Sequence, residues 1–230
     1  MRVALFVTCL ADTLQPSVGR ATVALLERLG VEVEFPRAQT CCGQLHLNAG
    51  HPEVASGLAQ RFVEVFAGYD AVVAPSGSCA GHVRAHAEHA EDPEGVAART
   101  FELSEFVVDR LGVTDVGSRF EGSVTYHPTC HSLRTLRLGD RPESLLRAVA
   151  GVDLRPLGEA TECCGFGGMF AVRNADVSTA MLADKLRRVE ETGADVVCAC
   201  DASCLLHIGG GLERRGSPVR AVHLAEVLAS

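Results

Sequence analysis

The sequence predicts an α/β protein of two tandem repeats, each a small Rossmann-like parallel sheet flanked by helices, related by pseudo-two-fold symmetry. Three observations support this prediction. Short apolar, β-branched runs alternate along the chain with longer stretches of helical periodicity. A set of four cysteines, which includes an adjacent pair followed by glycine, occurs twice at closely matched spacing. The segments around these cysteines also correspond between the two halves, as a duplicated unit would require.

The cysteines define the repeat. The first set is Cys9, Cys41, Cys42 and Cys79, and the second is Cys130, Cys163, Cys164 and Cys204. Corresponding members lie 121, 122, 122 and 125 residues apart. The flanking sequences agree, since LFVTC answers TYHPTC and DAVVAPSGSC answers DVVCACDASC. We therefore predict two cysteine-rich repeats, residues 1–117 and 118–230, joined at the glycine-rich segment VGSRFEG.

The same order of elements is predicted in both halves. In the first half, strands are expected at 3–8, 31–35 and 70–74, and helices at 16–29 and 54–67. In the second, strands are expected at 123–126, 152–156 and 195–199, and helices at 142–150 and 178–192. Pro16 suits a first helical turn and Gly30 suits the position after a helix end. Gly209–Gly211 are expected to cap a short helix and continue as a loop. Strand–helix alternation predicts parallel sheets covered on both faces.

Each repeated cysteine follows the carboxyl end of a predicted strand. In parallel α/β sheets these ends gather at one edge, where ligands bind. Four thiols that are distant in sequence should therefore converge in each half, and we expect a pair of separate pockets. Gly43 and Gly165, which follow the adjacent cysteines, allow a positive φ or a close approach of the backbone.

Composition bounds the class of protein. The first residues, MRVALFVTC, lack the features of a signal peptide, and no apolar run reaches the roughly 18 residues that span a bilayer. We therefore expect a cytoplasmic protein whose ten cysteines are reduced, and clustered thiols there indicate metal or redox chemistry. The net charge of −8, without a basic block, argues against a nucleic-acid partner.

Four converging thiolates suit either tetrahedral zinc or a [4Fe–4S] cluster. The chain lacks the local C-x₂-C pairs of zinc knuckles and the closely spaced cysteine runs of ferredoxins. The segment CCGFGG also lacks the G-x-G-x-x-G spacing of a dinucleotide loop. The spacing thus predicts metal sites and leaves the metal open.

The doubled pattern resembles the cysteine-rich CCG domain. That domain occurs twice in one of the subunits of heterodisulfide reductase and in the iron–sulfur subunits of glycolate and glycerol-3-phosphate dehydrogenases. Because it has two repeats and no ferredoxin domain, the chain is similar to the lactate utilization protein A branch of the family. The segments that carry the resemblance are FVTCLAD, CCGQ, GSC, YHPTC, CCGFGG, SCLL and HLAEVL.

This resemblance implies an iron–sulfur-binding redox component of a multi-subunit system that oxidises L-lactate to pyruvate. Such an oxidoreductase subunit is inactive alone and exchanges electrons with a ferredoxin-type partner, in the cytoplasm or at the inner face of the membrane through its partners. The eight repeated cysteines would hold up to two clusters of the [4Fe–4S] type. Two alternatives stay open: a cluster-dependent thiol–disulfide reductase of the heterodisulfide type, and a zinc-binding structural or assembly subunit. No catalytic residue is identified.

The chain departs from heterodisulfide reductase at one position of each repeat. Where that family has a C-x-x-C ending, this sequence has Ser76 and Asp201 as the first member. The change disfavours a non-cubane, disulfide-cleaving cluster and favours a conventional cluster or oxygen ligation by these two residues. Cys198 and Cys200 have no counterparts in the first half and are interpreted as core thiols, with ligation in the second half as the alternative.

Four histidines lie near the cysteines in sequence. His127 and His131 flank Cys130, while His82 and His207 each follow the last cysteine of a repeat by three residues. Imidazoles bind metals and relay protons, but outer or surface positions are favoured for these four. The position equivalent to His127 in the first half is Phe6.

Overall fold

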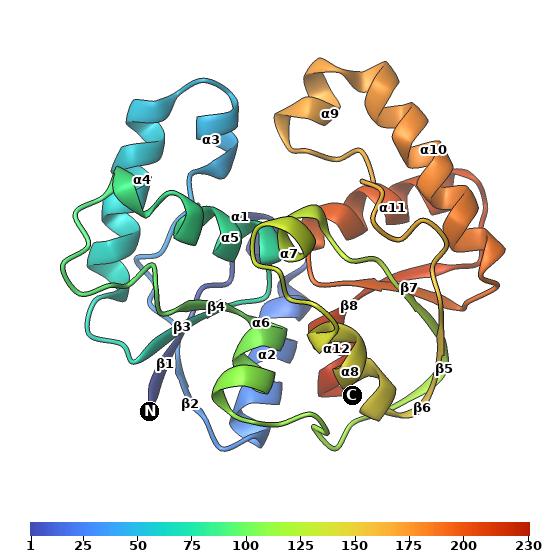
Figure 1. Ribbon diagram of the computed structural model, residues 1–230, viewed down its shortest axis with the longest axis horizontal. Coiled ribbons are helices and arrows are strands. Elements are labelled where there is room, and N and C mark those ends of the chain that lie inside the picture. The colour runs from blue at the N-terminus through green and yellow to red at the C-terminus, as the bar shows by residue number, and fades with distance from the viewer.

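The computed structural model describes residues 1–230 and contains two four-stranded parallel sheets (Figure 1). The first has the order β2-β1-β3-β4, with β1 Arg2–Leu5, β2 Glu32–Glu34, β3 Ala71–Ala74 and β4 Thr100–Glu102. The second has the order β6-β5-β7-β8, with β5 Arg119–Tyr126, β6 Ala150–Arg155, β7 Val196–Ala199 and β8 Arg220–His223. The strand orders correspond one to one, so the predicted α/β fold of two repeated parallel sheets is confirmed.

The two halves match at the level of single hydrogen bonds. The Phe6 N–H donates to the Val73 carbonyl at 2.9 Å, and the His127 N–H donates to the Cys198 carbonyl at 2.8 Å. Phe6 and His127 therefore occupy equivalent positions just beyond β1 and β5. This equivalence allows the two sites to be compared residue by residue.

The predicted helices occur in the predicted order, and the structure contains others without predicted bounds, of which α11 is the longest. The first half contains α1 Cys9–Leu14, α2 Pro16–Arg28, α3 Gln44–Asn48, α4 Pro52–Phe66, α5 Gly77–Ala85 and α6 Leu103–Glu105, with a 3₁₀ turn at Ala87–His89 and a π-helical turn at Phe106–Arg110. The second contains α7 Cys130–Arg134, α8 Arg141–Ala148, α9 Met169–Arg173, α10 Ala175–Glu191, α11 Ala202–Arg214 and α12 Leu224–Ala229. None of these helices has both the length and the apolar character needed to cross a membrane.

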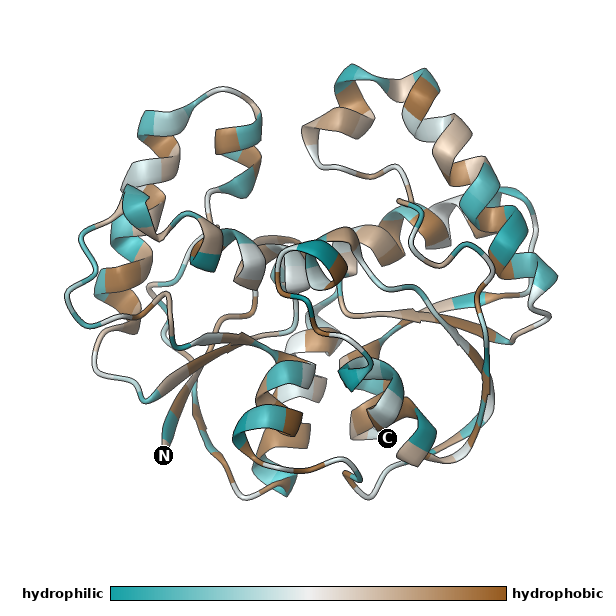
Figure 2. Ribbon diagram, viewed as in Figure 1, coloured by the Kyte–Doolittle hydropathy of each residue, from teal (hydrophilic) through white to brown (hydrophobic).

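The two sheets share one core. Helices α2, α6, α8 and α12 lie between them, and α2 packs against α12 (Figure 1). A cluster of 25 buried residues includes Val3 and Leu25 from the first half and Val124 and Leu228 from the second. The strands are largely hydrophobic in Figure 2, whereas the central helices carry both hydrophobic and hydrophilic residues, as expected of helices with one buried face. The halves are thus packed into one body, and the domain boundary after residue 117 stays a prediction.

The outer face of each sheet has a core of its own. Along β3, Ala71 and Val73 face the shared core, while Val72 and Ala74 face an outer cluster beneath α4. The second half repeats this arrangement with a smaller outer cluster beneath α10 and α11. Because both faces are covered, the central strands are apolar throughout, as expected of parallel sheets.

The prediction that Gly209–Gly211 form a cap and loop was wrong, because α11 continues through them. Leu205, Ile208 and Leu212 lie on one buried helical face, and burial of this face outweighs the low helix propensity of glycine. A Cβ atom on Gly211 would lie 2.7 Å from a methyl carbon of Leu186 on α10. The glycine therefore permits α11 to pack closely against α10.

Candidate metal centre

The eight repeated cysteines lie at the carboxyl-terminal edges of the two sheets. Cys9 and Cys130 begin α1 and α7, and Cys79 and Cys204 lie in the first turns of α5 and α11. The adjacent pairs lie in the loops that precede α3 and α9. The predicted convergence of thiols that are distant in sequence is therefore present in both halves.

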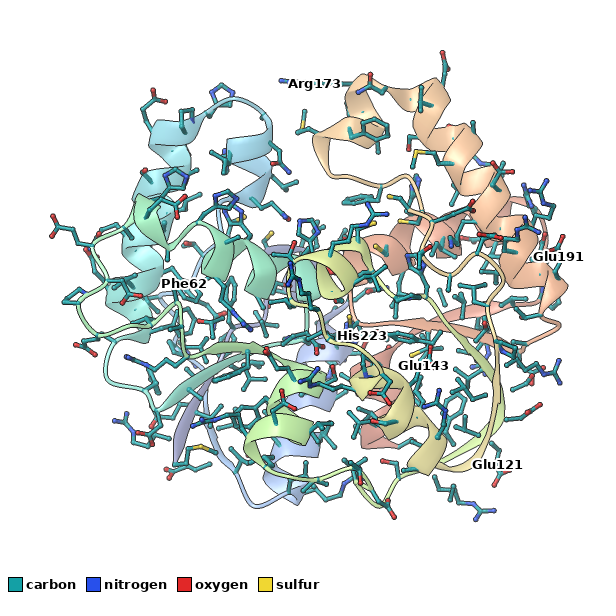
Figure 3. The ribbon with its side chains drawn as sticks, in the orientation of Figure 1. Phe62, Glu121, Glu143, Arg173, Glu191 and His223 are labelled. Carbon is teal, nitrogen blue, oxygen red and sulfur yellow. The ribbon has the colours of Figure 1, made fainter.

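All eight cysteines line one cavity of about 130 Å³. The expectation of two separate pockets was wrong, because the packing of α5 against α7 joins the two sheet edges. Gln44 Nε2 lies 2.9 Å from His131 Nε2, so side chains of the two halves meet at the cavity. The Arg173 guanidinium, which extends from α9, donates to the Ala49 carbonyl at 3.3 Å (Figure 3). The two sets of thiols thus face a common space.

In the first half the thiols form two close pairs. Cys9 Sγ lies 3.6 Å from Cys41 Sγ, and Cys42 Sγ lies 3.6 Å from Cys79 Sγ. Two thiolates on one tetrahedral metal atom with 2.3 Å bonds would be about 3.8 Å apart. The spacing therefore fits sulfur ligands that share a metal atom.

One thiol of each adjacent pair is held as a thiolate. Hydrogen bonds from Cys42 and Cys9 lower the pKa of Cys41 to about 2. Hydrogen bonds from Cys130 and Cys164 likewise lower the pKa of Cys163 to about 2. The Gly43 N–H donates to Cys41 Sγ at 3.4 Å, and the Gly165 N–H donates to Cys163 Sγ at 3.3 Å. The thiolate is the form that binds metal, so one cysteine of each half is favoured for ligation in the metal-free chain. The pKa values of its neighbours Cys9 and Cys42 in the first half, and Cys130 and Cys164 in the second, are raised by the same contacts and by burial.

These two glycines are required by the loop geometry. Gly43 has φ 93° and Gly165 has φ 91°, a region that residues with a Cβ rarely adopt. A Cβ on Gly43 would lie 3.3 Å from the Ala55 carbonyl oxygen, and one on Gly165 would lie 2.5 Å from the Ser178 carbonyl oxygen. Glycine therefore lets each cysteine loop rest against the helix behind it.

Ser76 and Asp201 connect the two halves. They form an isolated antiparallel bridge, as equivalent residues near a two-fold axis can. The Asp201 carboxylate accepts hydrogen bonds from Ser76 Oγ at 2.9 Å, Ser78 Oγ at 2.8 Å and the Ser78 N–H at 2.8 Å. Both residues line the cavity and are buried. Their oxygens are hydrogen-bonded to each other and so hold the two halves together, and ligation of a metal by either residue stays a prediction.

Cys198 and Cys200 are fully buried and do not line the cavity. Burial raises the pKa of both thiols, so they remain neutral. Cys200 Sγ lies 3.0 Å from Ser132 Oγ in the shared core. These positions agree with the interpretation of both residues as core thiols.

Among the four histidines, His127 stands out. It is fully buried and neither ring nitrogen has a hydrogen-bond partner. One ring nitrogen and the Sγ atoms of Cys164 and Cys204 all lie within 4.8 Å of one another. Burial lowers the pKa of His127 to about 3, which leaves the imidazole neutral and able to bind metal.

The other histidines have different surroundings. Burial lowers the pKa of His82 to about 4, with a further contribution from neighbouring His86. His207 Nε2 lies 3.4 Å from Ser178 Oγ. Neither lies close to two cysteine sulfurs as His127 does, so a position outside the metal ligands fits both.

Sequence reasoning missed Lys185. This lysine of α10 is fully buried, and its ammonium donates a hydrogen bond of 3.1 Å to the Glu159 carbonyl. Burial lowers the pKa of Lys185, while Glu162 and the nearby cysteines act in the opposite sense. The signal was available in the repeat, because the equivalent residue of α4 is the apolar Phe62.

Comparison with known proteins identifies the family to which this chain belongs. The cysteine-rich CCG domain matches residues 3–84 and 124–209. Lactate utilization protein A of Bacillus pumilus (strain SAFR-032) is 46% identical over 237 residues, covering 100% of both chains. Its namesake from Exiguobacterium sp. (strain ATCC BAA-1283 / AT1b) is 48% identical, covering 98% of this chain and 96% of the other. The chain belongs to the lactate utilization protein A family.

The two segments of this lactate utilization protein A family member that match the CCG domain contain all eight cysteines of the cavity. A solved structure of an aspartate racemase homologue from Pyrococcus horikoshii OT3 also matches, at 12% identity over 99% of this chain and 95% of that one. Its TM-score of 0.36 supports no inference about this family. The family assignment therefore rests on the sequence relatives and on the domain.

Proposed function

We propose that this chain is an iron–sulfur-binding redox component of a multi-subunit system that oxidises L-lactate to pyruvate. Its relatives are named lactate utilization protein A, and the relation extends over the full length of the chain. Loss of two electrons and two protons from lactate requires an acceptor. The chain has no sequence motif for a flavin or a nicotinamide, so we assign hydride chemistry to a partner subunit.

One observation carries the proposal: eight cysteines, four from each half, line a single cavity. The donor set fits a metal cluster, because soft thiolates favour iron–sulfur clusters and zinc. Two features at or beside the cavity support a resident metal group. The pKa values of Cys41 and Cys163 are strongly lowered, and the buried imidazole of His127, next to Cys164 and Cys204, lacks any partner within the chain.

Each half would hold its own group through its four repeated cysteines. An iron–sulfur cluster supplies one-electron transfer when bound. The residues of the chain position the sulfurs and stabilise two thiolates through the N–H groups of Gly43 and Gly165. A ferredoxin-type subunit is the proposed partner for electrons, in the cytoplasm or at the inner membrane face through other subunits.

Metal analysis tests the proposal. We would purify the chain without oxygen, measure iron, acid-labile sulfide and zinc per chain, and record EPR spectra after reduction. We expect iron and sulfide together, and a signal from a reduced cluster. Stoichiometric zinc without sulfide would reject the redox proposal.

A second function is supported by a specific observation. The 3.6 Å sulfur pairs of the first half match the edge of a tetrahedral site with 2.3 Å metal–sulfur bonds. Zinc held in this way would make the chain a structural or assembly subunit. The same analysis decides between the two, because only a cluster contains acid-labile sulfide.

A further inference from the structure

The two halves differ behind their cysteines, at positions that the backbone makes equivalent. Phe6 and His127 make the same hydrogen bond to the neighbouring strand. In the first half Phe6 packs against Phe62 and Phe66, with ring centroids 5.0 and 5.6 Å away. In the second half the residue at this place is an imidazole that lies among thiols.

The helices behind the cysteines can be aligned in the same way. Gly43 approaches the Ala55 carbonyl on α4, and Gly165 approaches the Ser178 carbonyl on α10. By this alignment Phe62 of α4, which is labelled in Figure 3, is the residue equivalent to Lys185 of α10. The aromatic pair of the first half is therefore replaced by an imidazole and an ammonium in the second.

The imidazole of His127 makes no hydrogen bond within the protein. Both ring nitrogens of His127 are buried and without a hydrogen-bond partner, which is costly for a polar group in a protein core. One of them lies within 4.8 Å of Cys164 Sγ and of Cys204 Sγ. A metal bound to these two sulfurs would satisfy that nitrogen.

The ammonium also requires a partner. Lys185 is buried, and the structure gives it one hydrogen bond, to the neutral Glu159 carbonyl. A buried cation is stabilised only when negative charge lies near it. Glu162 and the cysteines of the second half are its nearby negative groups, and thiolate ligands of a metal centre there add to that charge.

We propose that His127 is a nitrogen ligand of the metal centre in the second half, while the centre in the first half has sulfur ligands alone. The inference rests on the proposed function insofar as it requires a metal at the cysteines. It holds for either metal, because imidazole binds both iron and zinc. The two centres are then chemically distinct although the backbone repeats.

This difference orders the centres for electron transfer. A neutral imidazole adds no charge to the four thiolates, so the two centres differ in charge through Lys185. The ammonium of Lys185 lies near the cysteines of the second half and favours the reduced, more negative state of the centre there. The second centre is therefore reduced before the first.

Pulsed EPR of the reduced protein with ¹⁵N-labelled histidine tests the ligand directly. The test variant is His127→Phe, which installs the residue of the first half. We expect a strongly coupled histidine nitrogen in the unmodified protein and its loss in the variant, with the signal of the first centre unchanged. Absence of this coupling in the unmodified protein, or its persistence in the variant, would overturn the proposal.

Two further measurements keep the test decisive. His127→Cys supplies a sulfur in place of the nitrogen, so we expect metal content to be retained while the nitrogen coupling is lost, even where His127→Phe fails to fold. If the purified chain contains zinc and no sulfide, the redox proposal fails. X-ray absorption at the zinc edge then tests the ligand separately, since His127→Cys should remove the nitrogen contribution, and an unchanged spectrum would refute His127 ligation.

Discussion

In the first half, three aromatic rings pack behind the cysteines, with Phe62 and Phe66 centred 4.5 Å apart. In the second half the equivalent space holds His127, Lys185 and Val189. The cysteines themselves are presented alike, by strand ends, helix first turns and one glycine loop in each half. The backbone thus determines where the sulfurs lie, and the side chains behind them determine the charge around the metal.

A second pair of equivalent residues differs in the same way. Glu102 ends β4 and caps α6 by accepting the Ser104 N–H at 2.7 Å. His223 ends β8 and caps α12 by accepting the Ala225 N–H at 3.1 Å. His223 lies between the two sheets (Figure 3), with its Nε2 atom 3.1 Å from the Pro75 carbonyl oxygen. One backbone position therefore carries an acid in one half and a base in the other.

Removal of one ligand from each half should have the largest effect. We expect Cys42→Ser and Cys164→Ser each to lose one centre, because each removes a buried sulfur from one set of four. Metal analysis of each variant should show about half the iron. Cys198→Ala, outside the cavity, is the control and should retain all of it. If either single change empties both sets, the eight sulfurs hold one shared centre and the comparison of two centres fails.

The loop glycines should differ in their tolerance of a methyl group. A residue with φ near +90° costs about 1–2 kcal/mol when it carries a Cβ, so Gly43→Ala should lower the free energy of unfolding by about that amount. Gly165→Ala should cost more, about 3 kcal/mol, because its Cβ would lie 2.5 Å from the Ser178 carbonyl oxygen.

Urea unfolding of both variants measures the difference. Gly216→Ala is the matched control, since Gly216 has φ 67° and no atom within 4 Å of an added Cβ. It should cost no more than Gly43→Ala. Equal losses of unfolding free energy in Gly43→Ala and Gly165→Ala would show that the second loop accommodates a Cβ as easily as the first.

The sequence allowed the repeat, three of the four strands in each half and the convergence of the thiols to be predicted, whereas the edge strands β4 and β8 were missed. These features follow from local patterns: β-branched runs, Pro16 and Gly30 at the ends of a helix, and matched cysteine spacing. The single cavity could not be predicted, because it depends on how α2 packs against α12 and α5 against α7. No local pattern encodes that packing.

Other features of the site were partly visible. Lys185 lies on an amphipathic helix, where a lysine is expected to face solvent. Only its alignment with Phe62 reveals a buried position. His127 replaces Phe6 within otherwise matched segments, and this mismatch was the signal for a different chemistry in the second half. Differences between repeats were therefore more informative about charge than either repeat alone.

The two capping residues should give opposite pH dependences. Burial raises the pKa of Glu102 to about 7, so its contribution to stability is complete below pH 4.5 and is lost as the pH rises to 7. Burial lowers the pKa of His223 below 6.5, so its contribution is complete above pH 6.5 and is lost as the pH falls. Each pKa unit corresponds to about 1.4 kcal/mol, so Glu102 contributes up to about 3 kcal/mol.

Unfolding free energies measured from pH 4.5 to 8 check this contrast. Relative to the unmodified chain, Glu102→Gln should gain stability as the pH rises to 7, and His223→Gln should gain stability as the pH falls below 6.5. Each variant serves as the control for the other, because both replace a buried capping group by a neutral amide. Parallel profiles for the two variants would contradict the assignment of opposite slopes to the two halves.

Substitution of the equivalent residues Phe62 and Lys185 should have the smallest effects. In the metal-free protein each should change the free energy of unfolding by about 1 kcal/mol, with opposite signs. Phe62→Met removes aromatic contacts with Phe6 and Phe66 and should destabilise the chain. Lys185→Met removes a buried ammonium that lacks a carboxylate partner and should stabilise it. Urea unfolding after chelation measures both changes. With metal restored, the gain in stability from Lys185→Met should be smaller, because metal-bound thiolates add negative charge near the ammonium. An equal gain with and without metal would show that Lys185 does not interact with the second centre.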